Sequence, residues 1–538
     1  MLGTVSNKFH VARIMTRAGV VGSTVGRPDR GVRAIRALGD WGTSPAGAFT
    51  AAAIRSPNSI AVIDERGQLT YRDIHQRTNA LAHHWASQGI GVDDIVALMA
   101  RNHRGFVDAT VALAKLGAHV LLLNTMFAGP QIDAVCAREN VKLIVHDEEF
   151  SDLFDDIAYE APRELSWVDD ESAPHDFPTL GGIIVGANED DHTAPAKSGR
   201  QIILTSGTTG MPKGAQRPSP KSIEPIAAFL ERIPYRSGDS WMIAAPIFHA
   251  WGFLNWVLTT ALSGSTVVRR RFDPEGTLDW IARYRCENLV VVPVMLQRIV
   301  ELGPEVINRY DLSSLKVIAV SGSALPGDLA GRAMDLFGDV VYNLYGSTEV
   351  AIATIATPQD LREAPGTAGK PTRWTDLKIL DDHGREVPQG EVGRIFIRSG
   401  LSFEGYTGGA DKERINGLLS SGDVGHLDEA GRLFIDGRDD DMIITGGENV
   451  FPREIEDLLA DHSSIEEASV IGVDDERWGQ KLKAFVVLRT GETIDAQGVK
   501  DHVKAHLAGY KVPREVVFLE ALPRNATGKV LKRELGTE

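Results

Sequence analysis

Cysteine is scarce in this chain of 538 residues, which contains only Cys136 and Cys286. Two cysteines cannot supply a disulfide framework or a cysteine-based metal cluster, so the composition is typical of a reducing compartment. Long apolar runs are missing as well. No stretch approaches the roughly 18 apolar residues of a membrane span, and the N-terminus has no continuous apolar signal core. We therefore expect a soluble, cytoplasmic protein.

An excess of positive charge is also lacking, because 57 Lys and Arg residues stand against 73 Asp and Glu residues. Proteins that bind DNA or RNA cluster Lys and Arg, so a net charge of -16 argues against a nucleic-acid partner. The exception is residues 1–39, where Asp29 is the single acid among seven basic residues: Lys8, Arg13, Arg17, Arg27, Arg30, Arg33 and Arg36. This segment is interpreted either as a weak peripheral membrane contact or as a solvated basic extension that packs on the body.

Alternation of short apolar runs with helical patterns dominates the chain from about residue 60, as in "IVALMA", "KLIVH", "NLVVVP" and "LKVIAVSG". This alternation predicts an α/β fold with large parallel sheets covered by helices. Ligands of such folds bind where the carboxyl ends of the strands meet their loops. We therefore expect the functional site at those ends.

The pattern changes beyond residue 375 to shorter alternating strands joined by Gly, Asp and Pro turns, which predicts a small antiparallel, barrel-like subdomain. After Arg438, the rest of the chain reads as a compact mixed α+β domain of roughly 100 residues. We divide the chain into a basic extension (1–44), a large N-terminal domain (45–438) and a small mobile C-terminal domain (439–538).

The stretch "LTSGTTGMPKGA" at residues 204–215 follows a short apolar strand and is rich in glycines and hydroxyls. Glycines let backbone amides approach an anion, and hydroxyls add donors, so this loop fits a polyphosphate. It is not a Walker A motif, because Lys213 is followed by Gly214 rather than Ser or Thr. The predicted phosphate-binding residues are Thr205, Ser206, Gly207, Thr208, Thr209 and Gly210, with Lys213 as the cation.

Further motifs follow in a fixed order: "YGSTE" at 345, "SGD" at 421, "GRDDDMIITGGENVFPREIE" at 437 and "PRNATGKVLKREL" at 523. With the loop at 204, they give residues 45–538 a strong resemblance to the adenylate-forming superfamily, and within it to the fatty acyl-CoA synthetases. The resemblance implies two steps that use ATP, Mg²⁺ and coenzyme A. A carboxylate first displaces pyrophosphate from ATP to give acyl-AMP, and the thiol of coenzyme A then displaces AMP to give a thioester.

The resemblance also assigns residues to the nucleotide. Glu349 and the hydroxyl of Thr205 correspond to the Mg²⁺ ligands, Thr348 to an α-phosphate contact, and Asp423 with Arg438 to the ribose clamp. Tyr345 corresponds to the residue that stacks on adenine. The remaining nucleotide contacts are expected at Gly322, Ser323, Asn343, Gly346 and Ser347.

Lys529 corresponds to the catalytic lysine of the first step. Activation brings two anions together, so an ammonium that bridges the substrate carboxylate and the α-phosphate relieves their repulsion. Lys532 and Arg533 are interpreted as a solvated charged tail. For the second step, the resemblance makes Asp440 the hinge of the C-terminal domain and Gly446 and Gly447 the loop along which coenzyme A passes.

The acyl pocket is predicted at "PIFHAWGFLNWV", residues 246–257. His249 corresponds to an aromatic gate, Trp251 and Phe253 are expected in the pocket, and Trp256 is expected to pack in the core. No carboxylate lies in this stretch, whereas relatives that activate amino acids hold the substrate ammonium with an Asp. The stretch therefore favours an unsubstituted, apolar small-molecule carboxylic acid, and the resemblance to fatty acyl-CoA synthetases implies a medium or long chain.

One departure from the family is "AQRPSPKSIEP" after Gly214, where many relatives carry Thr-His or Ser-His. It leaves the subfamily open. The alternatives are a fatty acyl-AMP ligase that delivers to a carrier protein, an aryl-CoA ligase, and a nucleotide-binding pseudoenzyme. A homodimer is compatible with the sequence.

Overall fold

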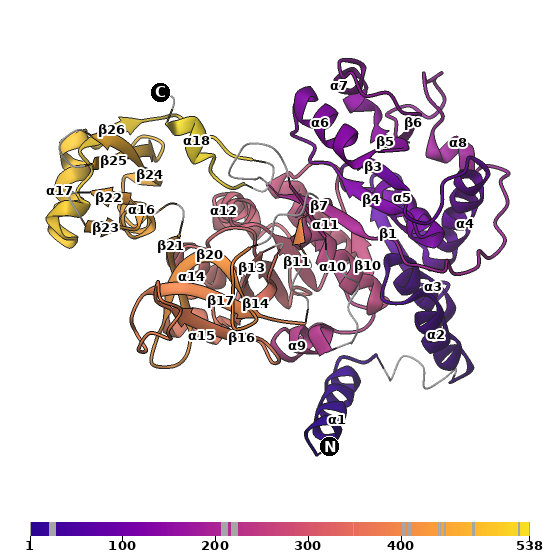
Figure 1. Ribbon diagram of the computed structural model, residues 1–538, viewed down its shortest axis with the longest axis horizontal. Coiled ribbons are helices and arrows are strands. Elements are labelled where there is room, and N and C mark those ends of the chain that lie inside the picture. Colours follow the sequence, from indigo (N-terminus) through magenta and orange to yellow (C-terminus); the bar gives the residue numbers. More distant parts are fainter. Residues whose placement is uncertain are drawn as a thin grey trace.

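The structure is a computed structural model that describes residues 2–20, 28–205, 213–216, 224–347, 349–400, 405–406, 412–439, 441, 443–445, 448–475, 479–525 and 528–536. Four sheets organise these residues, and Figure 1 shows them arranged from the indigo and purple N-terminal part to the yellow C-terminal domain. The α/β architecture predicted from the alternating runs is confirmed.

The largest sheet has nine strands and is parallel through its centre, with antiparallel strands at both edges. Two of its central strands are four-residue runs that are fully buried and, apart from Asn288, apolar, which suits strands covered on both faces. In spatial order the strands are β15 (Lys370–Pro371), β14 (Ala351–Ala356), β13 (Val341–Ser347), β12 (Val317–Val320), β11 (Asn288–Val291), β9 (Ser240–Ile243), β10 (Ser265–Val267), β1 (Ile60–Asp64) and β2 (Gly67–Thr70).

The second sheet has seven strands, of which five are parallel. Along β3, Val96 and Leu98 face the core shared with the first sheet, whereas Ala97 and Met99 face a second core under α6. Both faces are therefore apolar, which explains the unbroken run "IVALMA". The strands in order are β18 (Gly405–Tyr406), β8 (Lys213–Gln216), β7 (Gln201–Thr205), β4 (His119–Leu122), β3 (Ile95–Met99), β5 (Leu143–Asp147) and β6 (Arg163–Trp167).

Two smaller sheets complete the chain. The predicted antiparallel subdomain contains β16 (Asp376–Leu380), β17 (Gly393–Arg398), β19 (Arg414–Ile415), β20 (Leu418–Leu427) and β21 (Leu433–Arg438). The C-terminal domain contains β22 (Ile443–Thr445), β23 (Glu448–Val450), β24 (Ile465–Asp475), β25 (Gly479–Leu488) and β26 (Glu515–Phe518). Its helices are α16 (Pro452–Ala460), α17 (Ala496–His506) and α18 (Lys532–Leu535), and Pro452 opens α16 as predicted.

Helices of the N-terminal domain cover the two large sheets. The helix α3 (Pro45–Arg55) is buried along most of its length, because α2, α4, α5 and α10 all pack on it. The others are α1 (Leu2–Arg17), α2 (Pro28–Trp41), α4 (Tyr71–Ser87), α5 (Arg104–Leu116), α6 (Gly129–Glu139), α7 (Ser151–Asp155), α8 (Leu180–Ile184), α9 (Glu224–Arg232), α10 (Ala250–Ala261), α11 (Pro274–Tyr284), α12 (Pro293–Val300), α13 (Gly303–Ile307), α14 (Gly327–Phe337) and α15 (Pro358–Glu363). None of the helices described is both long and apolar enough to cross a membrane.

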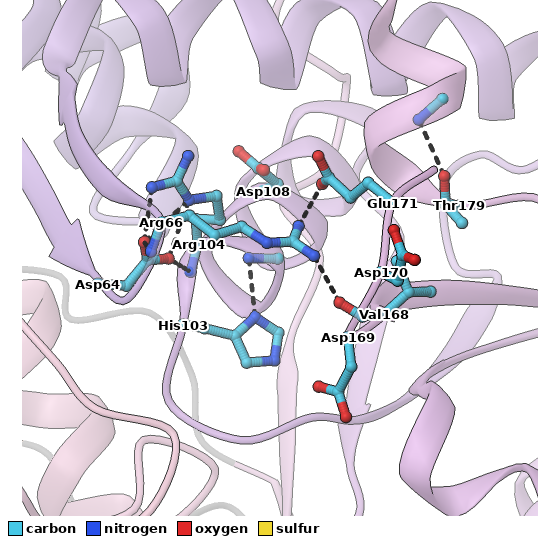
Figure 2. A network of polar contacts seen from close by, with 12 residues as sticks. Asp64, Arg66, His103, Arg104, Asp108, Val168, Asp169, Asp170, Glu171 and Thr179 are labelled. Carbon is cyan, nitrogen blue, oxygen red and sulfur yellow. Dashed lines mark hydrogen bonds and ion pairs between the residues drawn. The ribbon is translucent and has the colours of Figure 1, made fainter. Parts of the chain in front are cut away.

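A polar network ties the two large sheets together (Figure 2). Asp64, at the end of β1, accepts hydrogen bonds from the backbone and the guanidinium of Arg104 at the start of α5. Arg66 binds Glu171 and the carbonyl of Val168, which follow β6. Burial alone would raise the pKa of Asp64, but the bonds from Arg104 outweigh it and the pKa is lowered. The ionised pair therefore fixes the end of β1 to the start of α5.

Candidate active site

A cleft of about 1390 Å³ opens at the carboxyl ends of β9, β11, β12 and β13, where the sequence predicted a ligand site. The antiparallel subdomain and the C-terminal domain close its other sides. Of the predicted residues, the cleft is lined by His249, Trp251, Gly322, Ser323, Asn343, Tyr345, Gly346, Ser347, Glu349, Asp423, Arg438 and Lys529. Residues separated by 280 positions thus share one cavity.

The turn after β13 presents Glu349 to the cleft. Gly346 lies at an irregularity in the pairing of β13 with β14, and an added Cβ there would stand 1.7 Å from the carbonyl oxygen of Ala351. The hydroxyl of Ser347 donates a 2.8 Å hydrogen bond to Oε2 of Glu349 and accepts the backbone N–H of Glu349 at 3.2 Å. Glu349 is only 8% exposed. Its carboxylate is therefore held in a fixed orientation at the rim of the strand.

Asp423 and Arg438 stand opposite each other on β20 and β21, so their side chains share one face of the antiparallel pair. The hydroxyl of Tyr345 donates a 2.6 Å hydrogen bond to Oδ2 of Asp423. Burial raises the pKa of Asp423, and the bond from Tyr345 and the positive charges of Arg438, Lys412 and Lys529 act against it. Burial and the neighbouring carboxylate also raise the pKa of Tyr345, so its phenol stays a donor.

Asn343 and the turn at Gly322 form the wall beside this pair. The amide of Asn343 donates to the carbonyl of Thr367 at 3.1 Å, which fixes the side chain in place. Gly322 has a φ of +102°, and a Cβ on it would approach Val292 at 3.2 Å. Only glycine takes this conformation without strain, so the turn leaves Gly322 and Ser323 at the cavity surface.

Lys529 enters the cleft from the C-terminal domain on a tight turn. Asn525 holds this turn at both ends: its Oδ1 accepts the N–H of Lys529 at 2.9 Å, and its N–H donates to the carbonyl of Lys529 at 2.9 Å. Gly528 has a φ of +77°, and a Cβ there would stand 2.3 Å from Cγ1 of Val294 on α12. The backbone next to Lys529 therefore packs directly against the N-terminal domain.

The end of the cleft that was predicted to hold the acyl group lies at the start of α10. The indole of Trp251 donates to the carbonyl of Val291 at 3.0 Å, which orients the ring. Burial lowers the pKa of His249 to about 4, and its Nε2 is buried without a hydrogen-bond partner among the described residues. Phe253 was expected in the pocket; it does not line the described cleft, its ring centroid lies 5.3 Å from that of Trp256, and its place in the acyl pocket stays a prediction. Trp256 is fully buried, as predicted.

The predicted phosphate loop is described only at its two ends. Thr205 closes β7, Lys213 opens β8, and these residues pair across the two antiparallel strands. The remaining residues assigned by sequence lie outside the described residues: Ser206, Gly207, Thr208, Thr209, Gly210, Thr348, Asp440, Gly446 and Gly447.

The structure also places residues in the cleft that the sequence did not single out. Lys412 donates to the carbonyl of Ser421 at 2.7 Å and adds positive charge beside Asp423, yet no sequence pattern marks it. Lys532 was interpreted as part of a solvated tail, and this was wrong. Its Nζ lies 2.9 Å from Glu456 and 3.8 Å from Asp441, because α18 folds back onto β24.

Comparisons with known proteins agree with this geometry. A family model described as AMP-binding enzyme matches residues 49–407, and a model described as AMP-binding enzyme C-terminal domain matches residues 454–529. A feruloyl-CoA synthase from Amycolatopsis sp is 33% identical over 491 residues, which cover 89% of this chain and 96% of that protein. A 2-succinylbenzoate–CoA ligase from Geobacillus sp. (strain WCH70) is 32% identical over 490 residues, covering 90% and 95%. The ATP-bound crystal structure of MatB from Rhodopseudomonas palustris superposes with a TM-score of 0.81 at 27% identity, covering 91% and 98%.

Proposed function

The chain belongs to the AMP-binding enzyme family, and from this premise we propose that it joins an apolar carboxylic acid to coenzyme A, with a medium- or long-chain fatty acid as its first candidate substrate. It is an AMP-forming acyl- or aryl-CoA ligase, and it uses ATP, Mg²⁺ and coenzyme A. The observation that carries the proposal is the meeting of Lys529, Glu349 and Asp423 in one cleft whose acyl end is apolar.

In the first step, a carboxylate oxygen of the acid bonds to the α-phosphorus of ATP and the bond to pyrophosphate breaks. Both reacting groups are anions, so the step needs positive charge between them. The ammonium of Lys529 supplies this charge, because the turn at Asn525 aims it into the cleft. Pyrophosphate leaves with the electron pair of the broken P–O bond.

Glu349 suits Mg²⁺, which prefers oxygen ligands and keeps part of its shell for phosphate and water. Among the residues that the structure describes, no three His, Cys, Asp or Glu side chains form a metal site by themselves. We therefore assign Glu349 as one ligand of a Mg²⁺ ion that would be held mainly by the nucleotide. Bound there, Mg²⁺ neutralises phosphate charge.

Asp423 and Arg438 are assigned to the ribose. Oδ2 of Asp423 is occupied by the phenol of Tyr345, which leaves Oδ1 to accept sugar hydroxyls. The positive charges of Lys412, Arg438 and Lys529 oppose the effect of burial on the pKa of Asp423, so they favour the ionised form that accepts these bonds.

In the second step, the thiol sulfur of coenzyme A attacks the acyl carbonyl, AMP leaves, and the thiol proton passes to solvent. We assign this step to a second orientation of residues 439–538, reached by rotation near Asp440, with Gly446 and Gly447 along the pantetheine path. Because Lys529 of this domain occupies the cleft, the domain must move the lysine out before the thiol can enter.

Apolar character of the substrate is supported by the wall that α10 and its neighbours build: Ala245, Ala250, Trp251, Leu254, Leu325 and Ile352. His249 stays neutral near pH 7 because its pKa is lowered to about 4, so it adds no charge to this wall. An aromatic acid is the second candidate, because the two relatives named above carry feruloyl and succinylbenzoate in their names.

Substrate choice is tested by measuring thioester formation with octanoate, laurate and palmitate in competition with ferulate and indoleacetate. The highest kcat/KM for one of the fatty acids supports the first candidate, and the highest value for ferulate or indoleacetate replaces it with the second. Accumulation of acyl-AMP in the presence of free coenzyme A would instead assign the chain as a fatty acyl-AMP ligase serving a carrier protein.

The role of Lys529 is tested with Lys529→Ala. We expect acyl-AMP formation to fall by about a hundredfold or more, while conversion of supplied acyl-AMP to thioester is retained. Lys504→Ala, an exposed lysine of the same domain on α17, is the matched control and should leave both half-reactions unchanged. Pyrophosphate release at the wild-type rate from Lys529→Ala would refute the assignment.

A further inference from the structure

The helix α2 carries an exposed apolar stripe. Val32, Ile35 and Leu38 are 69%, 72% and 41% exposed, and their spacing of three residues places them along one side of the helix. The other side of the helix carries the small residues Gly31, Ala34 and Ala37, which are buried where α2 packs on α3. The helix is therefore held by its small residues while its large apolar side chains point away from the body.

Arginines run along the same helix. Arg30, Arg33 and Arg36 repeat at the same spacing of three, and Arg36 lies one turn after Val32, so the two stripes border each other. Within the described part of the chain, no ion pair is formed by these three guanidinium groups. Asp29 and Asp40 lie near the two ends of α2 and leave the centre of the helix basic.

Charge complementarity identifies what this face binds. The first 40 residues contain seven basic and two acidic side chains, and the remaining chain contains 50 basic and 71 acidic side chains. A negatively charged surface therefore repels the body and attracts this segment. A second copy of the chain fits less well, because a twofold contact through this face would set the same three arginines against each other.

We propose that α2 docks the enzyme reversibly on anionic membrane lipids, with Val32, Ile35 and Leu38 entering the interface and Arg30, Arg33 and Arg36 binding lipid phosphates. Apolar side chains beside basic ones on one exposed helix match the chemistry of that interface. The proposal stands independently of the acid that the enzyme activates. Figure 1 shows α2 at the edge of the molecule beside α3, far from the C-terminal domain, so docking leaves that domain free to move.

Docking would also bring an apolar acid close to its pocket. The helix α2 packs on α3, and α3 packs on α10, whose first turn lines the acyl end of the cleft. Fatty acids partition into bilayers, so an enzyme held there meets a higher local concentration of such a substrate.

The test is co-sedimentation of the full-length protein with vesicles of phosphatidylglycerol and phosphatidylcholine, compared with vesicles of phosphatidylcholine alone. We expect the wild type to bind the anionic vesicles at low salt, and V32Q/I35Q/L38Q to lose binding at least tenfold. R30Q/R33Q/R36Q should lose the preference for the anionic vesicles by about fivefold per arginine, since each such contact contributes about 1 kcal/mol. Glutamine favours helix, so both variants should keep α2 folded.

The matched control is M126Q/V185Q/V392Q, which replaces three apolar residues of similar exposure that are scattered singly over the surface. It should bind vesicles like the wild type. Equal binding by the stripe variant, or no binding by the wild type, would overturn the proposal. Light scattering that shows a wild-type dimer dissociated by V32Q/I35Q/L38Q would assign the face to self-association instead, and would overturn it too.

Discussion

Oδ2 of Asp423 receives a 2.6 Å hydrogen bond from the hydroxyl of Tyr345, which lies on a different sheet 78 residues earlier in the chain. The bond joins the end of β13 to β20, and so it connects the nine-stranded sheet to the antiparallel subdomain. It also lowers the pKa of a carboxyl group that burial raises.

Tyr345→Phe should therefore weaken ATP binding and make it more sensitive to acid. Without the phenol, the pKa of Asp423 rises further, and the carboxylate is protonated at a higher pH. We expect the KM for ATP to rise about tenfold, as for the loss of a bond to a charged group, and the acid limb of kcat/KM to move to higher pH. Tyr342→Phe, a half-buried tyrosine on the same strand, is the control, and an equal effect there would contradict the assignment.

Gly528→Ala should impair the first half-reaction selectively. The new Cβ would meet Val294 at 2.3 Å, so the turn that carries Lys529 must move. We expect acyl-AMP formation to fall at least tenfold, with thioester formation from supplied acyl-AMP retained. Gly491→Ala is matched to it, because Gly491 has a φ of +84° in the same domain with open space around it. If both substitutions slow adenylation equally, contact with Val294 is not the cause.

Glu349→Gln should raise the requirement for Mg²⁺. The amide keeps the size of the side chain and its contact with Ser347, but it removes the negative charge that attracts the cation. We expect kcat to fall by about a hundredfold and the Mg²⁺ concentration for half-maximal rate to rise, measured by pyrophosphate release. Glu413→Gln, another acid of the cleft, should leave the Mg²⁺ titration unchanged. An unchanged Mg²⁺ titration for Glu349→Gln would show that Glu349 is not a Mg²⁺ ligand.

Lys115→Met should change how stability depends on pH. Lys115 is 1% exposed, and its Nζ donates to Asn79 Oδ1 and, at 2.9 Å, to Thr78 Oγ1. Burial lowers its pKa to about 7. The unfolded chain, in which the lysine has its usual pKa of roughly 10.4, binds the proton more tightly. This group therefore destabilises the fold most strongly below pH 7, and the penalty disappears as pH rises from 7 to the unfolded pKa of roughly 10.4.

The free energy of unfolding of the wild type should then increase relative to Lys115→Met by about 1 kcal/mol per pH unit between pH 7 and 10. Urea titrations of both proteins across that range measure it. Parallel pH profiles would show that Lys115 stays charged in the fold, contrary to the effect of burial.

Much of the site was predictable because its residues stand in motifs attached to strand ends. Asp423 and Arg438 were expected together because both match the ribose clamp of the family, and the structure places them opposite each other on β20 and β21. The hydrogen bond from Tyr345 to Asp423 could not be predicted, because nothing in the sequence fixes how the antiparallel subdomain is oriented toward β13. Lys412 was missed for the same reason.

Errors arose where burial depends on the packing of distant segments. Phe253 does not line the described cleft, and its ring packs on Trp256, which Phe49 of α3 and Phe106 of α5 also contact. Lys532 lies in a charged terminal run that resembles a solvated tail, and only the return of α18 onto β24 gives it Glu456 as a partner. The sequence showed that residues 1–39 form a basic segment with interspersed apolar residues. It could not show which of these apolar residues are exposed on α2.

Gly528 packs on Val294, so the turn that carries Lys529 is itself part of the contact between the two domains. In the proposed mechanism, a rotation that separates these two residues would withdraw the ammonium at the same moment, and the reverse rotation would restore it. Under that mechanism the enzyme would need no separate signal that its small domain has docked, because arrival of the charge and closure of the gap would be one event.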